Sequence, residues 1–186
     1  MTPKQRTGLF IFLALVTLFW RLIPHPPNIA LLGALSVTAG YYLKGHYRFS
    51  IPLAVAIVSD QIIGTYAWQI MASVYISYVL YSLLGCNRQP RRLSLLFNPI
   101  VGAVLGAVLF FLITNAAVWL WSGMYEPTSA GFLLSYINAL PFFRNSLLSD
   151  IYGTAGIVAI VSVANRLFEN YNQQYVTAGQ TNTEHV

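Results

Sequence analysis

Charged residues are scarce in this chain: they make up 8% of its 186 residues, whereas hydrophobic residues make up 56%. Water-soluble domains carry about 25% charged residues, so this composition argues against a soluble globular fold. Such a chain is better divided into membrane spans of about 20 residues. The composition therefore predicts an integral membrane protein of the all-α class.

Cysteine and the common catalytic motifs are equally scarce. The chain has one cysteine, which excludes an internal disulfide and a multi-thiolate metal site. The sequence contains no GxxxxGK[ST] phosphate loop, no HExxH and no GxSxG, and these are the motifs of conventional ATPases, zinc proteases and serine hydrolases. We therefore predict no catalytic residue, no metal site and no enzymatic activity.

Six apolar stretches are present, and they predict a bundle of six transmembrane helices. They cover residues 8–23, 29–43, 49–64, 66–85, 99–121 and 146–168. No signal-peptide cleavage site follows the first stretch, so we expect it to be retained. Residues 1–168 then form one six-span membrane domain. Residues 169–186 are polar and have nothing to bury, so we expect a disordered cytoplasmic tail.

The basic residues predict the orientation of these helices. With the N-terminus inside, eight of the ten Lys and Arg residues fall on inside segments, and only Arg21 and Arg144 fall outside. Cytoplasmic loops carry such an excess of basic residues. We therefore expect both termini in the cytoplasm, and we interpret the net charge of +5 as topology, with no nucleic-acid partner.

Polar side chains gather toward the predicted outer face, from separate parts of the chain. His25, Asp60, Asn115 and Arg144 all fall there, with Trp119 nearby. An ionisable group within a membrane indicates a functional site, so we predict a ligand pocket in which Asp60 pairs with Arg144. Each residue also has a structural interpretation. His25 could lie on a loop stiffened by prolines, and Asp60 could cap a helix. Arg144 and Trp119 could anchor their segments at the membrane interface.

The segment 123–145 is expected to cover this pocket. It begins with a turn-rich stretch too polar to span a membrane, and residues 131–141 read as a short amphipathic helix ending at a proline. Long loops with their own helix are often lids. We therefore predict an outer lid loop that carries a short helix.

Spacings of small residues predict close helix contacts. Gly102 and Gly106 are four residues apart, as are Ala30 and Ala34. Such pairs let helix backbones approach one another in membranes. Packing within the bundle is the favoured interpretation, and contact with a partner helix is the alternative.

Three segments together resemble a known family. They are residues 21–28 (RLIPHPPN), Ser59-Asp60 with Gly64, and residues 139–146 (ALPFFRNS) followed by Asp150. They are similar to the substrate-binding S components of bacterial energy-coupling factor transporters, and most similar to the solitary cobalamin S components. The resemblance covers about residues 20–168.

The resemblance implies a function in uptake. It implies a subunit of the bacterial inner membrane that takes up a vitamin-like molecule from the outer face, with cobalamin or a related corrinoid as one ligand. An energy-coupling membrane subunit and ATPases would be its partners, and Tyr78 would line the pocket. The fourth-span cysteine that ligates cobalt in such proteins has no counterpart here, because Cys86 lies at the cytoplasmic end. Ser73 lies nearer that position, and His25 would be the replacement ligand.

Two other function classes stay open. Asp60 and Asp150 occur in similar short segments: each directly follows a serine, and a glycine, Gly64 or Gly153, lies within the next four residues. Two aspartates that share a proton can hydrolyse a bond. The GxGD signature of intramembrane aspartyl proteases is missing, however. The second alternative is a membrane scaffold without a ligand.

Overall fold

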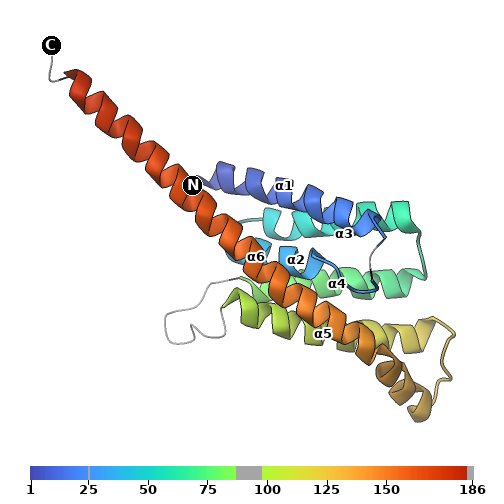
Figure 1. The fold of residues 1–186 in the computed structure, drawn as a ribbon. Coiled ribbons are helices and arrows are strands. Elements are labelled where there is room, and N and C mark those ends of the chain that lie inside the picture. The colour runs from blue at the N-terminus through green and yellow to red at the C-terminus, as the bar shows by residue number, and fades with distance from the viewer. Residues whose placement is uncertain (25, 87–97, 184–186) are drawn as a thin grey trace.

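The computed structural model describes residues 1–24, 26–86 and 98–183, and in these ranges the regular elements are six α-helices. Figure 1 shows them running back and forth, with both chain termini toward the same end. In order, they are α1 (Pro3–Leu22), α2 (Leu32–Tyr42), α3 (Tyr47–Ile63), α4 (Trp68–Leu84), α5 (Pro99–Trp121) and α6 (Ser129–Thr183). We call the end where α3 finishes the Asp60 end, and the opposite end the Lys44 end.

Local sequence explains where several helices begin and end. Thr2 and Gln5 form a reciprocal capping box at the start of α1, which satisfies two backbone N–H groups that would otherwise lack a partner. The Asn98 side chain accepts a hydrogen bond from the Ile100 N–H, and Pro99 occupies the first turn of α5, where proline costs no hydrogen bond. Gly64 ends α3 with a φ of 130°, a conformation that favours glycine.

The short helix α2 lies at the centre of the bundle. It contacts each of the other five helices, and Figure 1 shows it between them, with α6 crossing it. All of its residues from Leu32 to Gly40 are buried. Its 11 residues measure about 16 Å, whereas the hydrocarbon core of a bilayer is about 30 Å thick. α2 is thus enclosed by protein on every side.

Within the described ranges, three helices are long and apolar enough to cross a membrane: Pro3–Leu22, Pro99–Trp121 and the part of α6 from Ser129 to Tyr171. Helix α4 is apolar but shorter. The protein is therefore a membrane protein, and the described part of its chain is all-α with six helices. The six helices follow the order of the predicted stretches, and α5 has the predicted bounds.

Glycines bring the inner helices into close contact. A side chain at Gly40 would overlap the backbone of Ser82 on α4, and one at Gly106 would overlap the ring of Tyr81. Gly102 faces Val37 of α2, and Gly153 of α6 faces Ala34. The contacts at Gly102 and Gly106 confirm packing within the bundle for that pair, whereas Ala30 lies before α2, so Ala30 and Ala34 do not share a helix.

The prediction of an outer lid loop with a separate short helix is wrong. Only residues 122–128 connect α5 to α6, and α6 then runs without interruption through Pro141. A proline removes one hydrogen bond, here the one to the carbonyl of residue 137, and membrane helices tolerate such a loss when their surroundings compensate. The predicted short helix 131–141 and the predicted sixth span are thus one element.

The predicted boundary at residue 168 also differs from the structure. Helix α6 continues through residue 168 to Thr183, where we expected a disordered tail. Figure 1 shows this end of α6 projecting beyond the other helices. Extending a helix costs far less than starting one, so a polar segment can continue a helix that the membrane part has begun.

Candidate functional site

Two adjoining cavities lead from the α1–α2 connection into the middle of the bundle. Their volumes are about 50 Å³ and about 100 Å³, and both are lined by Asn28, Phe110 and Ser146. The first cavity continues to Gly33, Tyr78, Tyr81 and Asp150. The second continues along α5 and α6, where its polar lining is Thr114 and Asn115. We call this connected space the central pocket.

Asp150 is the acidic residue in the lining of the central pocket. Only 4% of the residue is exposed, and it lies against Gly33 of α2, where any side chain would overlap the carboxylate. The Tyr81 hydroxyl donates a hydrogen bond to Asp150 Oδ2, and the backbone of Ala34 provides a second hydrogen bond. Both partners are neutral, and no salt bridge to Asp150 forms within the described ranges. Asp150 is thus a buried carboxyl group held without a cation.

Aromatic rings form the wall beside this carboxyl group. The Tyr78 and Phe110 ring centroids are 5.5 Å apart, and those of Tyr78 and Tyr81 are 6.2 Å apart. Gly106 leaves room for the Tyr81 ring against α5. The close approach of α4 and α5 therefore fixes the tyrosine that donates to Asp150.

The second part of the pocket is mainly apolar. The Phe111 and Phe143 ring centroids are 4.7 Å apart, which joins α5 to α6. The side-chain amide of Asn115 donates to the Phe111 carbonyl at 2.7 Å, and its oxygen has no partner among the described residues. An amide oxygen accepts hydrogen bonds, so this part of the pocket combines an aromatic wall with one acceptor.

The connection between α1 and α2 is fastened to α6 beside the pocket. Asn145 donates to the Pro27 carbonyl at 3.0 Å, and Ser149 donates to the Ala30 carbonyl at 2.7 Å. Asn28 has a φ of 62°, in the left-handed region that asparagine adopts more readily than most residues. These contacts bring three segments of the chain to the mouth of the pocket.

Asp60 does not pair with Arg144, so that prediction is wrong. The Arg21 guanidinium at the end of α1 donates to Asp60 Oδ1 at 2.8 Å, and the Asp60 side chain is 4% exposed. Arg144 is exposed and forms no ion pair within the described part of the chain. Arg21 is the nearer cation because α1 packs directly against α3.

Tyrosines surround the Arg21–Asp60 pair at the Asp60 end. The Tyr75 hydroxyl lies close to the Asp60 carboxylate. Burial, together with the Asp60 charge, raises the pKa of the Tyr66 phenol to about 12. That phenol therefore stays protonated at neutral pH and remains a hydrogen-bond donor.

The residues predicted for the site fall in several places. Tyr78 and Asn115 line the central pocket. Asp60 and Arg144 do not appear in its lining, and neither does Trp119, whose ring nitrogen donates to the Glu126 carbonyl at 3.0 Å and so fastens the turn between α5 and α6. His25 lies outside the described residues, so its predicted approach to the pocket stays a prediction.

Ser73, which lies nearest the cobalt-ligand position of the resemblance, and Cys86, which was expected at the cytoplasmic end, are both absent from the pocket lining. The Ser73 hydroxyl donates to the Ile70 carbonyl of its own helix, and Cys86 contacts the Arg48 guanidinium at the Lys44 end. The described residues contain no cluster of three His, Cys, Asp or Glu side chains that could hold a metal.

Sequence reasoning missed three features of the site. Tyr81 was not singled out, although it lies one turn after Tyr78 on the same helix face. Gly33 carried no signal, because its role depends on where α6 crosses α2. Arg21 could have been found from the sequence, since it lies at the same predicted depth in the membrane as Asp60.

The fold and the cavities define the class of this protein: a helical membrane protein with an internal pocket that is lined mainly by apolar and aromatic side chains and contains one buried carboxyl group. The chain belongs to the DUF6580 family, described as a family of unknown function, which matches residues 1–174. No curated protein and no solved structure matches the chain.

Proposed function

We propose that this protein is the substrate-binding subunit of an uptake system for a small, vitamin-like organic solute. In this proposal all six helices serve as membrane spans of the bacterial inner membrane, with both termini in the cytoplasm and the Asp60 end outside. The observation that carries it is Asp150, which lines a cavity and whose hydrogen-bond partners among the described residues are neutral. A carboxyl group buried in a membrane protein without a cation is expensive, and such groups mark ligand sites.

The pocket favours a particular class of solute. A cationic or N–H group would face Asp150, and an apolar part would lie against Phe111 and Phe143. The two cavities, of about 50 Å³ and 100 Å³, are smaller than the roughly 300–1,000 Å³ of typical ligand pockets. A solute of few atoms fits this conformation, whereas cobalamin or another corrinoid would require α6 to move away from α5.

Transport against a gradient would need partners in this proposal. The chain has no phosphate-binding loop, so ATP hydrolysis would come from separate ATPases through an energy-coupling membrane subunit. The solute and the lipid bilayer would be the other partners. No cofactor is proposed.

The test begins with the purified protein in detergent and mass spectrometry of the small molecules that accompany it. Asp150→Asn keeps the shape of the side chain but removes the charge, and a charge-assisted hydrogen bond contributes about 1.5–3 kcal/mol. The dissociation constant for the identified solute should therefore rise about 10- to 100-fold. Glu169→Gln makes the same chemical change on an exposed part of α6 and should leave binding unchanged.

A second variant tests the shape of the pocket. Gly33→Ala introduces a methyl group that overlaps the Asp150 carboxylate, whereas Gly156→Ala adds one in open space. The first should abolish solute binding, and the second should not. Equal affinity in wild type and Asp150→Asn, or no accompanying solute and no rescue of an uptake-deficient auxotroph, would contradict the proposal and favour a scaffold.

The alternative of an intramembrane hydrolase has less support. Asp60 is bound by Arg21 and Asp150 by Tyr81, so the two carboxyl groups do not share a hydrogen bond. A hydrolase that used both should lose activity with either Asp→Asn change. Solute binding at the central pocket should depend on Asp150 and not on the charge of Asp60.

A further inference from the structure

A wide groove lies at the Lys44 end, between the first turns of α1 and the connection from α2 to α3. Its volume is about 560 Å³, several times that of either cavity of the central pocket. It is lined by Met1, Pro3, Lys4, Arg6, Thr7, Gly8, Ile11, Tyr42, Leu43, Lys44 and Tyr47. None of these residues contributes to the central pocket.

The groove carries positive charge without a matching negative charge. Lys4, Arg6 and Lys44 line it, and the lining contains no acidic residue. The chain has no Asp or Glu before Asp60, which lies at the opposite end of α3. Like charges brought together in this way favour an anion between them.

The guanidinium group of Arg6 has hydrogen-bond donors that the described residues do not fully satisfy. Its terminal nitrogen donates to the Tyr42 carbonyl over a long 3.4 Å, and its Nε is buried without a hydrogen-bond partner among the described residues. A buried donor without a partner is costly. A phosphate oxygen would satisfy it, because the guanidinium group suits the geometry of phosphate.

The groove also has an apolar side that continues onto the outer face of α1. Gly8 leaves open space, since a side-chain carbon there would meet no atom within 4 Å. Ile11 lines the groove and is half exposed, and the next residue, Phe12, is 61% exposed. α1 is one of the helices able to cross a membrane, so an exposed apolar face on it suits lipid tails.

We propose that this groove binds the headgroup of an anionic phospholipid. The phosphodiester lies between Lys4, Arg6 and Lys44, and an acyl chain runs along Gly8 and Ile11. A basic cluster where a membrane helix begins is the typical place for such contacts. The single negative charge and the attached chain distinguish this ligand from free phosphate, which lacks the apolar part.

The experiment measures lipid preference in nanodiscs of equimolar phosphatidylglycerol and phosphatidylcholine, with spin-labelled forms of both lipids. The wild-type protein should retain the phosphatidylglycerol label more strongly. Each basic residue near a membrane surface contributes roughly a fivefold preference, so Lys4→Gln, Arg6→Gln or Lys44→Gln should each reduce it by about that factor. The triple variant should show no preference.

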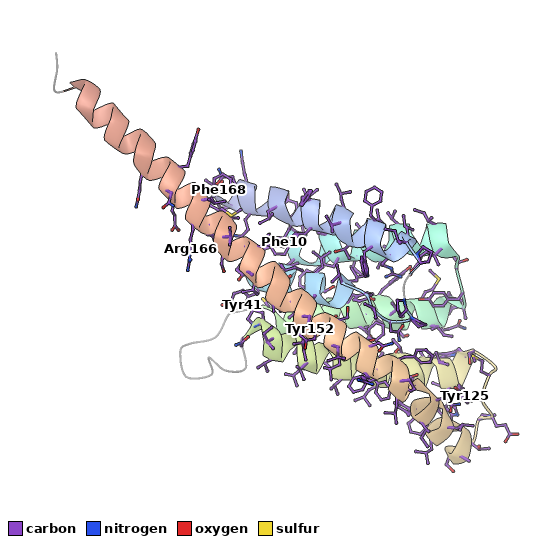
Figure 2. The ribbon with its side chains drawn as sticks, viewed as in Figure 1. Phe10, Tyr41, Tyr125, Tyr152, Arg166 and Phe168 are labelled. Carbon is purple, nitrogen blue, oxygen red and sulfur yellow. The ribbon has the colours of Figure 1, made fainter. Side chains whose placement is uncertain are left out.

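Matched variants separate this effect from misfolding and from general charge. Arg166→Gln removes a basic residue from an exposed position on α6, where Figure 2 shows the side chain projecting from the bundle, and should leave the preference intact. Lys4→Arg with Lys44→Arg keeps both charges and should also retain it. A wild-type protein without preference, or a triple variant that keeps it, would overturn the proposal.

A competition experiment identifies the source of the phosphate. Glycerol 3-phosphate has the charged group but no acyl chain, and inorganic phosphate is smaller still. Neither should displace the phosphatidylglycerol label at concentrations that saturate a free-phosphate site. Displacement by either compound would overturn the assignment to a lipid and indicate a site for soluble phosphate esters.

Discussion

At the scale of single residues, the two buried aspartates have opposite electrostatic surroundings. Asp60 accepts a hydrogen bond from the Arg21 guanidinium at 2.8 Å, so its charge is balanced within the protein. Asp150 is held by the Tyr81 hydroxyl and a backbone group, which leave its charge unbalanced. The first aspartate thus suits a structural role, and the second suits contact with a ligand.

Removal of the Arg21 charge should destabilise the protein. Arg21→Gln leaves the Asp60 carboxylate buried without its cation, and breaking such a pair from one side costs about 3 kcal/mol or more. We expect a clearly lower thermal unfolding midpoint in detergent. Arg144→Gln changes an exposed arginine that has no ion-pair partner among the described residues, and it should alter stability by no more than about 0.5 kcal/mol.

A double variant completes this comparison. Arg21→Gln combined with Asp60→Asn removes both charges and should recover most of the lost stability, because no unpaired charge stays buried. If Arg144→Gln were the more destabilising single change, the pairing of Asp60 with Arg21 would be wrong.

The sequence predicts how deep these residues lie in the membrane, but it does not predict which residues form ion pairs or contacts with them. Arg21 and Arg144 both lie at predicted outer ends, and the choice between them depends on α1 packing against α3. The same limit explains why Tyr78 and Asn115 could be singled out while Tyr81 and Gly33 could not. The contact of Gly33 with Asp150 joins residues more than 100 positions apart, and no local pattern reports it.

At the scale of elements, α6 is the helix that differs most from the sequence-based prediction. It extends over 55 residues from Ser129 to Thr183 and includes Pro141. It supplies Asp150 to the pocket and fastens the α1–α2 connection through Asn145 and Ser149. Figure 2 shows Tyr152 on its outward side, where 72% of that residue is exposed.

Spin labels can test whether α6 is continuous through Pro141. Leu133 and Leu148 are both exposed, and a helix rising 1.5 Å per residue places their backbones roughly 22 Å apart. Labels at Leu148 and Val163 have the same sequence separation within the predicted sixth span, so both pairs should give similar distances by pulsed electron resonance. A much shorter or broader distance distribution for the Leu133–Leu148 pair would contradict the continuous helix and support a separate lid loop.

The elements that sequence located well are those with apolar runs and capping signals of their own. Helix α5 begins at Pro99 after the Asn98 cap, and its bounds agree with the prediction. The lid-loop prediction is wrong because Pro141 does not end the helix. Contacts with neighbouring helices stabilise α6 as one continuous element through this proline. Residues 169–183 are helical because they extend an existing helix instead of forming one alone.

At the scale of the whole molecule, the arrangement of the six helices determines which loops share a side. The start of α1 and the C-terminal part of α6 lie toward the same end in Figure 1, as the proposed six-span topology requires. The groove with Lys4, Arg6 and Lys44 lies at that end too. This agrees with an orientation in which basic residues remain in the cytoplasm.

Reporter fusions test the proposed six-span topology. A reporter at Gly45 or at the C-terminus should be active only in the cytoplasm, and one at Thr128 only outside. The physical reason is the excess of basic residues at the Lys44 end, which resists transfer across the membrane. A C-terminal reporter on the outer face would mean that one helix does not cross.

The central position of α2 has a consequence for how the protein is made. α2 leaves the ribosome well before α6, yet one of its faces packs on α6. During translation that face, including the space at Gly33 for Asp150, stays uncovered until residues near 150 have entered the membrane. Chaperone or insertase protection of α2 and its neighbours should therefore be needed until α6 has been synthesised. A chain interrupted before α6 would leave its own centre open to lipid and to degradation.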